Sequence, residues 1–440
     1  MRLISIPEWG RLYRGNATDC SQSNIDSSNW QNATLTHHDF QDVLSLLQDS
    51  SDCDFKQFFR FSLVNGREVL TTQNYVGIIQ TSSGCQIEIL PKISKSMSQA
   101  CARSLLVKML VKLQDSPFKE STLADIDPQK MSLFELVFSL FLSRVREIIQ
   151  TGIVRQYVDQ QGNLVFLRGK LQFYEHIRRN CIERSRFYCE YDEYELNHPI
   201  NRLMKLALST VSKLSKSSIN LQTCNEYLHW FDHVPESHDF RTDFRAIKQD
   251  RFVQHYEKAL PIAKLILEQM NPLTVPGQHS VFSMLFNMNR VFEDYVAAKL
   301  DLKMRGWQIN KRVARKYLVD EHNNQKNFLL IPDLELTHVG DNQIESRRVI
   351  ADTKWKLINE KNPYDLTETD LYQMFTYAKK YLVDQLVKVV VLIYPATDNF
   401  KSPLNPFWFD QHRTEVLLVL PFDLQNDQLV VPQDLKNFDW

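Results

Sequence analysis

The stretch VKVVVLIYP, residues 387–395, is almost wholly apolar and constrains the fold more than any other segment of the chain. A strand that is buried on both faces has this composition, because neither of its faces meets water. A helical pattern with Thr367 or Thr369 as N-cap precedes it, and a second apolar run, TEVLLVLPFDL, follows it. Strands and helices alternate in this way in α/β domains, so residues 276–440 are predicted to form one such domain around a mixed central sheet.

Two further regions precede this domain. Residues 1–95 are β-rich, and their clearest element is a hairpin in YVGIIQTSSGCQIEILPKIS, residues 75–94, where TSSG supplies the turn. Residues 96–275 are mainly helical with a β-containing insert. The whole chain is therefore predicted to be multidomain α+β.

The helical periodicity of the middle region gives definite ends for some elements. One helix is expected to end at Gly152, a second to start after Pro199, and a third to kink at Pro261. The β insert is expected to turn at Gln161–Gly162. Beyond the middle region, residues 279–303 are predicted to form a single helix.

Basic side chains gather between residues 144 and 186. They form either a solvated helical surface, which is the commoner role of charged residues, or a patch that contacts phosphate groups. The residues are Arg144, Arg146, Arg155, Arg168, Lys170, Arg178, Arg179, Arg184 and Arg186.

Composition argues against several classes of protein. The formal net charge is -1, so no global basic field marks a nucleic-acid binder, although a local basic groove is compatible with it. Seven cysteines form no CxxC pair and are odd in number, which argues against a disulfide framework and a structural zinc site. We find no signal peptide and no membrane-spanning apolar run. A soluble, cytoplasmic protein that contacts no membrane is expected.

Glycine is scarce, which bears on nucleotide binding. The chain has 11 glycines and contains neither GxxxxGK[ST] nor GxGxxG. Backbone cradles for phosphate groups need those glycines. If nucleotide hydrolysis drives the function, another subunit is expected to carry it out.

The segment Ile331–Leu357 reads as a hairpin with unusually placed charges. Residues two apart on a strand share a face, so Asp352 and Lys354 point the same way, and Asp333 lies on the partner strand. Two facing carboxylates repel each other unless a cation lies between them. Oxygen ligands favour Mg²⁺ or Mn²⁺, and the Thr353 carbonyl can add another ligand. With Lys354 beside the metal to orient or activate water, the cluster suits metal-assisted hydrolysis of a phosphodiester.

A simpler interpretation is a surface hairpin with one Asp–Lys ion pair, because such triplets are common in long sequences. Glu293 lies beside the apolar stripe of the preceding helix, and Gln373 lies on the helix after the hairpin. Each either reaches the same cluster or occupies an ordinary polar position.

These residues together resemble a known family. Pro332–Asp333 and the DTK of Asp352–Lys354, with Glu293 and Gln373, resemble the PD-(D/E)xK nuclease core. More specifically, the chain resembles the McrC family, the nuclease subunit of McrBC-type modification-dependent restriction systems. Four further stretches carry this resemblance: VGIIQTSSGCQIEILPKIS, LRGKLQF, YDEYELNHPINRLMKLAL and DLYQMFTYAKKY.

The resemblance implies a C-terminal PD-(D/E)xK endonuclease-like domain that cleaves double-stranded DNA, methylated or unmodified, with Mg²⁺ or Mn²⁺. It implies that Asp333, Asp352 and Lys354 are catalytic, with Glu293 and Gln373 assisting. It also implies an McrB-like AAA+ GTPase ring that binds GTP, and an N-terminal domain, residues 1–95, that docks on this ring and stimulates it. Such systems defend cells against foreign DNA.

Two alternatives are open on the sequence alone. One is a stand-alone Mg²⁺-dependent nuclease with no nucleotide requirement. The other is a non-catalytic adaptor of an AAA+ ring, although the intact Asp333, Asp352 and Lys354 speak against it.

Overall fold

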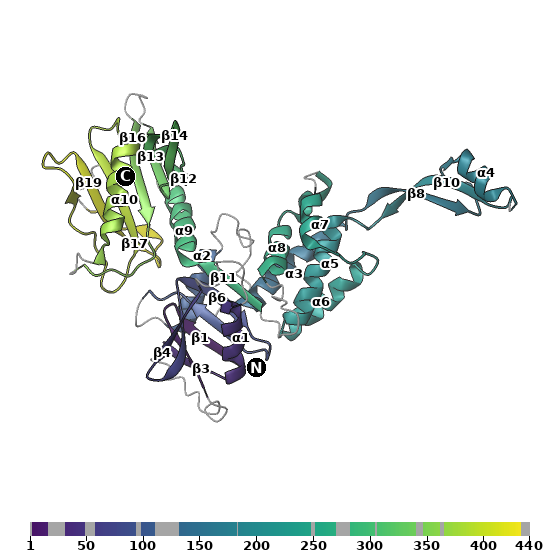
Figure 1. Cartoon of the computed structure of the whole chain (residues 1–440), viewed down its shortest axis with the longest axis horizontal. Helices are drawn as coiled ribbons and strands as arrows, with labels where there is room; N and C mark the ends of the chain where they lie inside the picture. Colours follow the sequence, from purple (N-terminus) through teal and green to yellow (C-terminus); the bar gives the residue numbers. More distant parts are fainter. Residues whose placement is uncertain are drawn as a thin grey trace. The chain divides into compact units, whose positions relative to one another are not determined.

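The helices and strands of the chain gather in two units (Figure 1). One contains Met1–Lys130 with Pro272–Trp440, and the other contains Met131–Asn271. The computed structural model describes residues 2–15, 31–48, 58–93, 98–110, 132–182, 184–247, 251–269, 282–303, 306–339, 346–360 and 365–432. Both units contain helices and strands, so the predicted multidomain α+β class is confirmed at this level. None of the helices in the described ranges has the length and apolar character that a membrane crossing requires.

Two four-stranded sheets form the N-terminal part of the first unit. The first has the order β1 (Leu3–Pro7), β7 (Gln86–Leu90), β6 (Tyr75–Gln80) and β11 (Phe282–Asn287). The second has the order β3 (Asn32–Leu35), β2 (Arg11–Arg14), β5 (Arg67–Thr72) and β4 (Phe59–Val64). Strands β6 and β7 form the predicted antiparallel hairpin. Helix α1 (His37–Gln48) places Phe40 and Val43 in the apolar core that these strands share.

Strand β11 corrects the prediction of a single helix over residues 279–303. The described part of that stretch contains β11 followed by α9 (Met288–Lys303). Strand β11 pairs antiparallel with β6, about two hundred residues earlier in the chain, and so joins the N-terminal sheet to the helix of the C-terminal domain (Figure 1). Gly77 permits the close approach, since a Cβ there would lie 1.9 Å from the Met284 carbonyl oxygen. Apolar periodicity alone did not reveal this long-range pairing.

The second unit is mainly helical. Helix α3 ends at Thr151 before Gly152, which has a φ of 112°, and α5 begins at Pro199, so both predicted ends are confirmed. The run around Pro261 is divided instead of kinked, because a 3₁₀ helix ends at Tyr256 before α8 begins. The helices are α3 (Leu133–Thr151), α5 (Pro199–Leu214), α6 (Ser218–Trp230), α7 (Phe240–Ala246), η4 (Arg251–Tyr256) and α8 (Leu260–Gln269).

The predicted β insert is a three-stranded sheet with one helix. Its elements are β8 (Gln156–Leu164), β9 (Lys170–Leu171), α4 (Phe173–Asn180) and β10 (Phe187–Glu195). The expected turn at Gln161–Gly162 is wrong, because both residues continue β8 and pair with β10. A glycine in an extended ladder pairs like any other residue, so it does not mark a turn here. Local carboxylates pair with several of the basic residues, as on a solvated surface: Arg144 with Glu147, Arg168 with Glu193, and Arg178 and Arg179 with Glu175.

A mixed seven-stranded sheet forms the C-terminal part of the first unit. Its order is β12 (Trp307–Lys311), β15 (Leu334–Val339), β16 (Ser346–Thr353), β17 (Lys388–Pro395), β19 (Glu415–Asp423) and β18 (Phe407–Trp408), with β20 (Gln428–Leu429) also paired to β19. Strands β16, β17 and β19 are parallel, and β17 and β19 are largely buried as their apolar sequences predict. Strands β15 and β16 form the predicted antiparallel hairpin. A separate hairpin pairs β13 (Lys316–His322) with β14 (Gln325–Leu330).

Two helices accompany this sheet. Helix α10 (Glu368–Tyr381) is capped by the Thr367 side chain, one of the two predicted N-caps. Its Met374, Tyr377 and Ala378 pack in the core formed with β16, β17 and β19. Helix α9 places Phe292 against Trp355, the residue that follows Lys354, with ring centroids 5.3 Å apart. Both helices therefore reach the end of β16, where the predicted site residues lie.

Candidate active site

One register row across three neighbouring strands brings the predicted acidic residues together. The last paired row in these strands contains Lys311 of β12, Leu334 of β15 and Ala351 of β16. One step further along, Arg312, Asp333 and Asp352 occupy the next row at this edge of the sheet. The Arg312 amide donates a hydrogen bond to the Asp333 carbonyl at 2.9 Å, which ties the first two positions together.

Asp333 lies at the entrance of β15. The sequence predicted it on the partner strand of the hairpin, and the structure puts it one residue before that strand begins. Strand β14 ends at Leu330, the chain bends at Asp333, and β15 begins at Leu334. Proline at position 332 lacks the N–H that would continue a ladder, which is consistent with the break.

Asp352, Lys354 and Gln373 form a connected group. The Lys354 ammonium lies 2.7 Å from Asp352 Oδ2 and donates to Gln373 Oε1 at 3.1 Å. Gln373 Nε2 donates to Asp352 Oδ1 at 3.3 Å and to the Tyr377 hydroxyl at 2.8 Å. Asp370 lies 3.9 Å from the same ammonium. Helix α10 thus brings Gln373 to the end of β16, which is one of the two positions that the sequence left open, and Gln373 holds both charged side chains there.

Thr353 positions Asp333. Its amide and hydroxyl both donate to Asp333 Oδ2, at 2.7 and 2.9 Å. The other carboxylate oxygen, Oδ1, is not used by these two bonds. The Thr353 carbonyl was predicted to bind the metal. In the structure, the amide and the hydroxyl of Thr353 orient the Asp333 carboxylate.

Glu293 lies close to the cluster but is held by a different partner. Arg312 donates from Nε to Glu293 Oε1 and from Nη2 to Oε2, both at 2.7 Å. The charge of Glu293 still acts on the site, since it contributes to raising the pKa of both Asp333 and Asp352. Arg312 was not predicted as a site residue, because its only sequence signal is its place in the basic run NKRVARK.

Burial raises the pKa of both aspartates. Desolvation, followed by repulsion from Asp352 and Glu293, raises the pKa of Asp333 to about 7. Desolvation also raises the pKa of Asp352, although Lys354 works against it. Burial acts to lower the pKa of Lys354, but the ion pair with Asp352 outweighs it, so the pKa is raised and the ammonium stays protonated.

The donor set fits a hard divalent cation. Asp352 Oδ2 is buried and lies 2.7 Å from the Lys354 ammonium, which offsets one negative charge at the site. One ammonium does not balance Asp333 and Asp352 together, and a divalent cation would relieve the repulsion that remains between the two carboxylates. Two carboxylates on adjacent strand ends supply the oxygen ligands that Mg²⁺ and Mn²⁺ prefer.

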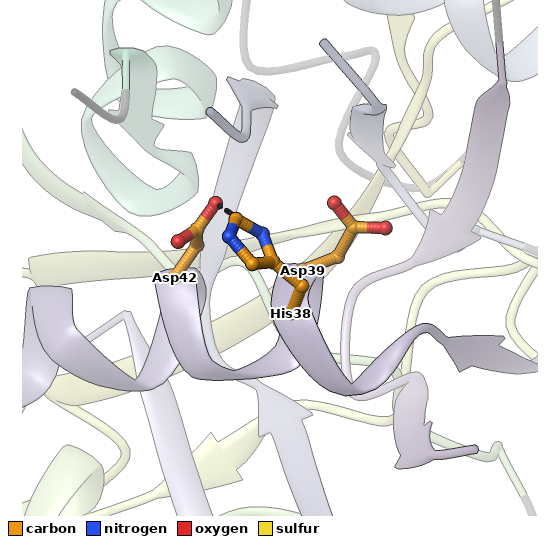
Figure 2. Close-up of side chains that lie close together, drawn as sticks. All are labelled: His38, Asp39 and Asp42. Carbon is orange, nitrogen blue, oxygen red and sulfur yellow. Dashed lines mark ion pairs between the residues drawn. The ribbon is translucent and has the colours of Figure 1, made fainter. Parts of the chain in front are cut away.

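A second acidic cluster lies on α1 and serves another purpose. In the described ranges, the ligand atoms of His38, Asp39 and Asp42 come within 4.8 Å of one another (Figure 2). Asp39 accepts hydrogen bonds from Thr36, Thr81 and Ser83, and Asp42 accepts from the Ser82 amide and hydroxyl. These bonds fasten the turn of the β6–β7 hairpin to α1, which accounts for the cluster as a structural feature.

The fold and the site define a mixed-sheet α/β domain with a buried acid–lysine cluster at the end of adjacent strands. A family model described as "McrBC 5-methylcytosine restriction system component" matches residues 70–395. The chain belongs to this family, which confirms the family resemblance read from the sequence.

One solved structure shows the same fold. The chain is 17% identical to a chain in the refined half-complex from a tetradecameric assembly of Thermococcus gammatolerans McrB AAA+ hexamers with bound McrC, with a TM-score of 0.66. That match covers 99% of this chain and 98% of the other. A cryo-EM structure of the Thermococcus gammatolerans McrBC complex matches with 18% identity and a TM-score of 0.48, covering 72% and 90% of the two chains. No curated protein matches the sequence significantly.

Proposed function

We propose that the chain is the DNA endonuclease subunit of a GTP-dependent, McrBC-like restriction complex. The observation that carries the proposal is the row of Asp333 and Asp352 at adjacent strand ends, with Lys354 fixed 2.7 Å from Asp352. Membership of the McrBC family supplies the biological setting. Residues 276–440 are then a PD-(D/E)xK nuclease domain, and the substrate is double-stranded DNA inside the cytoplasm.

Asp333 and Asp352 would hold Mg²⁺, with Mn²⁺ as a substitute, and the Thr353 carbonyl is the proposed third protein ligand. Such an ion supplies Lewis acidity at the phosphate and lowers the pKa of water. Thr353 keeps one oxygen of Asp333 engaged through its amide and hydroxyl, so the carboxylate is oriented before any ligand arrives.

Lys354 has a defined electrostatic role in this proposal. Because its pKa is raised, the side chain is a cation at neutral pH and is unsuited to accept a proton from water. It can instead donate a hydrogen bond to a phosphate oxygen and offset the negative charge that develops there. Gln373 keeps the ammonium in place while it holds Asp352, so it acts as a positioning residue.

The proposed partner is an McrB-like AAA+ GTPase ring. The sequence has no phosphate-binding glycine loop, so GTP would be bound by the partner and not by this chain. The similar solved structure contains McrB AAA+ hexamers with bound McrC. We further propose the organisation expected from the sequence, in which residues 1–95 dock on the ring and stimulate its GTPase, residues 96–275 form a middle region, and the C-terminal domain cuts DNA.

Reconstitution of the full chain with an McrB-type subunit tests this function. Asp333→Ala and Lys354→Ala are each expected to abolish DNA cleavage in Mg²⁺ and GTP, while stimulation of GTP hydrolysis stays at the wild-type level. Cleavage by either variant at the wild-type rate would refute the site. Cleavage by the purified chain without GTP would instead favour a stand-alone nuclease, and GTPase stimulation without any cleavage would favour an adaptor.

A further inference from the structure

Arg312 lies in the same row as the two aspartates, next to Asp333. It follows the last residue of β12, and its amide binds the Asp333 carbonyl at 2.9 Å. Lys354 lies on the Asp352 side of the row, so Arg312 is a second cation on the Asp333 side. The edge of the sheet is thus flanked by a cation at each end of its carboxylate pair.

The backbone of Arg312 is in a conformation that L-residues rarely adopt. Its φ is 47°, in the left-handed region, which carries a steric cost for a residue with a Cβ. Residues with such a strained backbone persist where contacts with the surrounding structure hold them in that conformation. Here the strained backbone lets one residue bind Asp333 through its main chain and Glu293 through its side chain.

The guanidinium is only partly used. Its Nε and Nη2 chelate Glu293, while Nη1 makes no hydrogen bond to any residue in the described ranges. The Arg312 side chain is 41% exposed, whereas the side chain of Glu293 is 10% exposed. The ion pair therefore leaves its cationic partner partly exposed to solvent and keeps its acidic partner largely buried.

A guanidinium fork that fits a carboxylate also fits a phosphate, because both offer two oxygens in one plane at matching separation. We propose that Arg312 is a phosphate-binding residue, which contacts the DNA backbone on the Asp333 side of the site through its exposed edge or by leaving Glu293. This rests on the proposed nuclease function and adds a DNA contact to it. Arg312 and Lys354 would then contact the backbone from opposite ends of the carboxylate row.

The alternative is that Arg312 merely holds helix α9 through Glu293. Lys311 offers a matched control, because it is the last residue of β12 and pairs with Asp294 of α9 at 3.0 Å, but it lies outside the row. Substitution of either residue by glutamine removes one positive charge and one ion pair with helix α9.

The experiment measures binding of the full chain to a short labelled DNA duplex in EDTA, where no cleavage occurs, across a series of salt concentrations. Arg312→Gln is expected to weaken binding about tenfold and to reduce the salt dependence by about one ion. Lys311→Gln is expected to change neither value. Thermal melting of each variant identifies any loss of fold.

The decisive comparison places Arg312→Gln in a Glu293→Gln background, where the ion pair between residues 312 and 293 is already absent. The proposal predicts the same loss of affinity and of salt dependence in this background. If the double variant binds DNA as tightly as Glu293→Gln alone, the role of Arg312 is structural and the proposal is overturned. In that case a wild-type chain that cuts DNA would leave the nuclease function standing, whereas a chain that neither binds nor cuts DNA would refute both.

Discussion

Asp333→Asn is predicted to stabilise the metal-free protein at alkaline pH while it abolishes cleavage. The folded-state pKa of Asp333 is raised to about 7 from an ordinary value of 3.8. A carboxyl whose pKa is raised on folding stabilises the native state below its unfolded pKa, and this contribution is lost as the pH rises through the folded pKa. Asparagine keeps an oxygen that can accept the two bonds from Thr353 but carries no charge.

The size of the effect follows from the two pKa values. Their difference of about 3, at about 1.4 kcal/mol for each pKa unit, gives about 4 kcal/mol between acidic and alkaline pH. More than half of this change falls between pH 5 and pH 8, because the unfolded chain has mostly ionised by pH 5 and the folded site has not. The free energy of unfolding of Asp333→Asn should therefore exceed that of the wild type by a margin that grows over this interval.

Chemical denaturation in EDTA at pH 5 and pH 8 measures this margin. Addition of Mg²⁺ at pH 8 should then stabilise the wild type, whose aspartates are relieved of their repulsion, and leave Asp333→Asn nearly unchanged. A margin that is constant with pH, or a variant that is less stable than the wild type at pH 8, would refute the reasoning.

Three further substitutions test other contacts. Lys354→Gln should reduce cleavage by at least about a hundredfold, and a variant that retains DNA binding but cuts normally would contradict the role of the ammonium. Gln373→Ala, which frees Asp352 and Lys354, should cost about ten- to a hundredfold in metal affinity or cleavage rate, and an unchanged Mg²⁺ titration would contradict it. Gly77→Ala should destabilise the fold by about 3 kcal/mol or more, because its Cβ would lie 1.9 Å from the Met284 carbonyl oxygen; an unaltered melting temperature would contradict this packing.

The sequence was most informative where local spacing determines geometry. Alternation on a strand put Asp352 and Lys354 on one face, and the structure places their charged atoms 2.7 Å apart. The apolar strand of residues 387–395, the cap at Thr367 and the helix end at Gly152 are likewise local features, and each is present as predicted.

Long-range partners could not be predicted in this way. Strand β11 pairs with β6, about two hundred residues earlier in the chain, and no periodicity in its own sequence identifies that neighbour. The sequence left open whether Glu293 reaches the acidic cluster, and in the structure its two oxygens bind Arg312, whose position depends on the strand register. Charged residues at strand ends acquire their partners from the fold, so their roles needed the three-dimensional arrangement.

The most direct test of the account is DNA cleavage by Asp352→Asn beside the wild type, with an McrB-type subunit, Mg²⁺ and GTP present. Asparagine removes the charge of a carboxylate whose Oδ2 lies 2.7 Å from the Lys354 ammonium and keeps the size of the side chain. The account predicts that the wild type cuts the DNA, and that the variant does not, while both stimulate GTP hydrolysis equally. Cleavage by Asp352→Asn at the wild-type rate would contradict it.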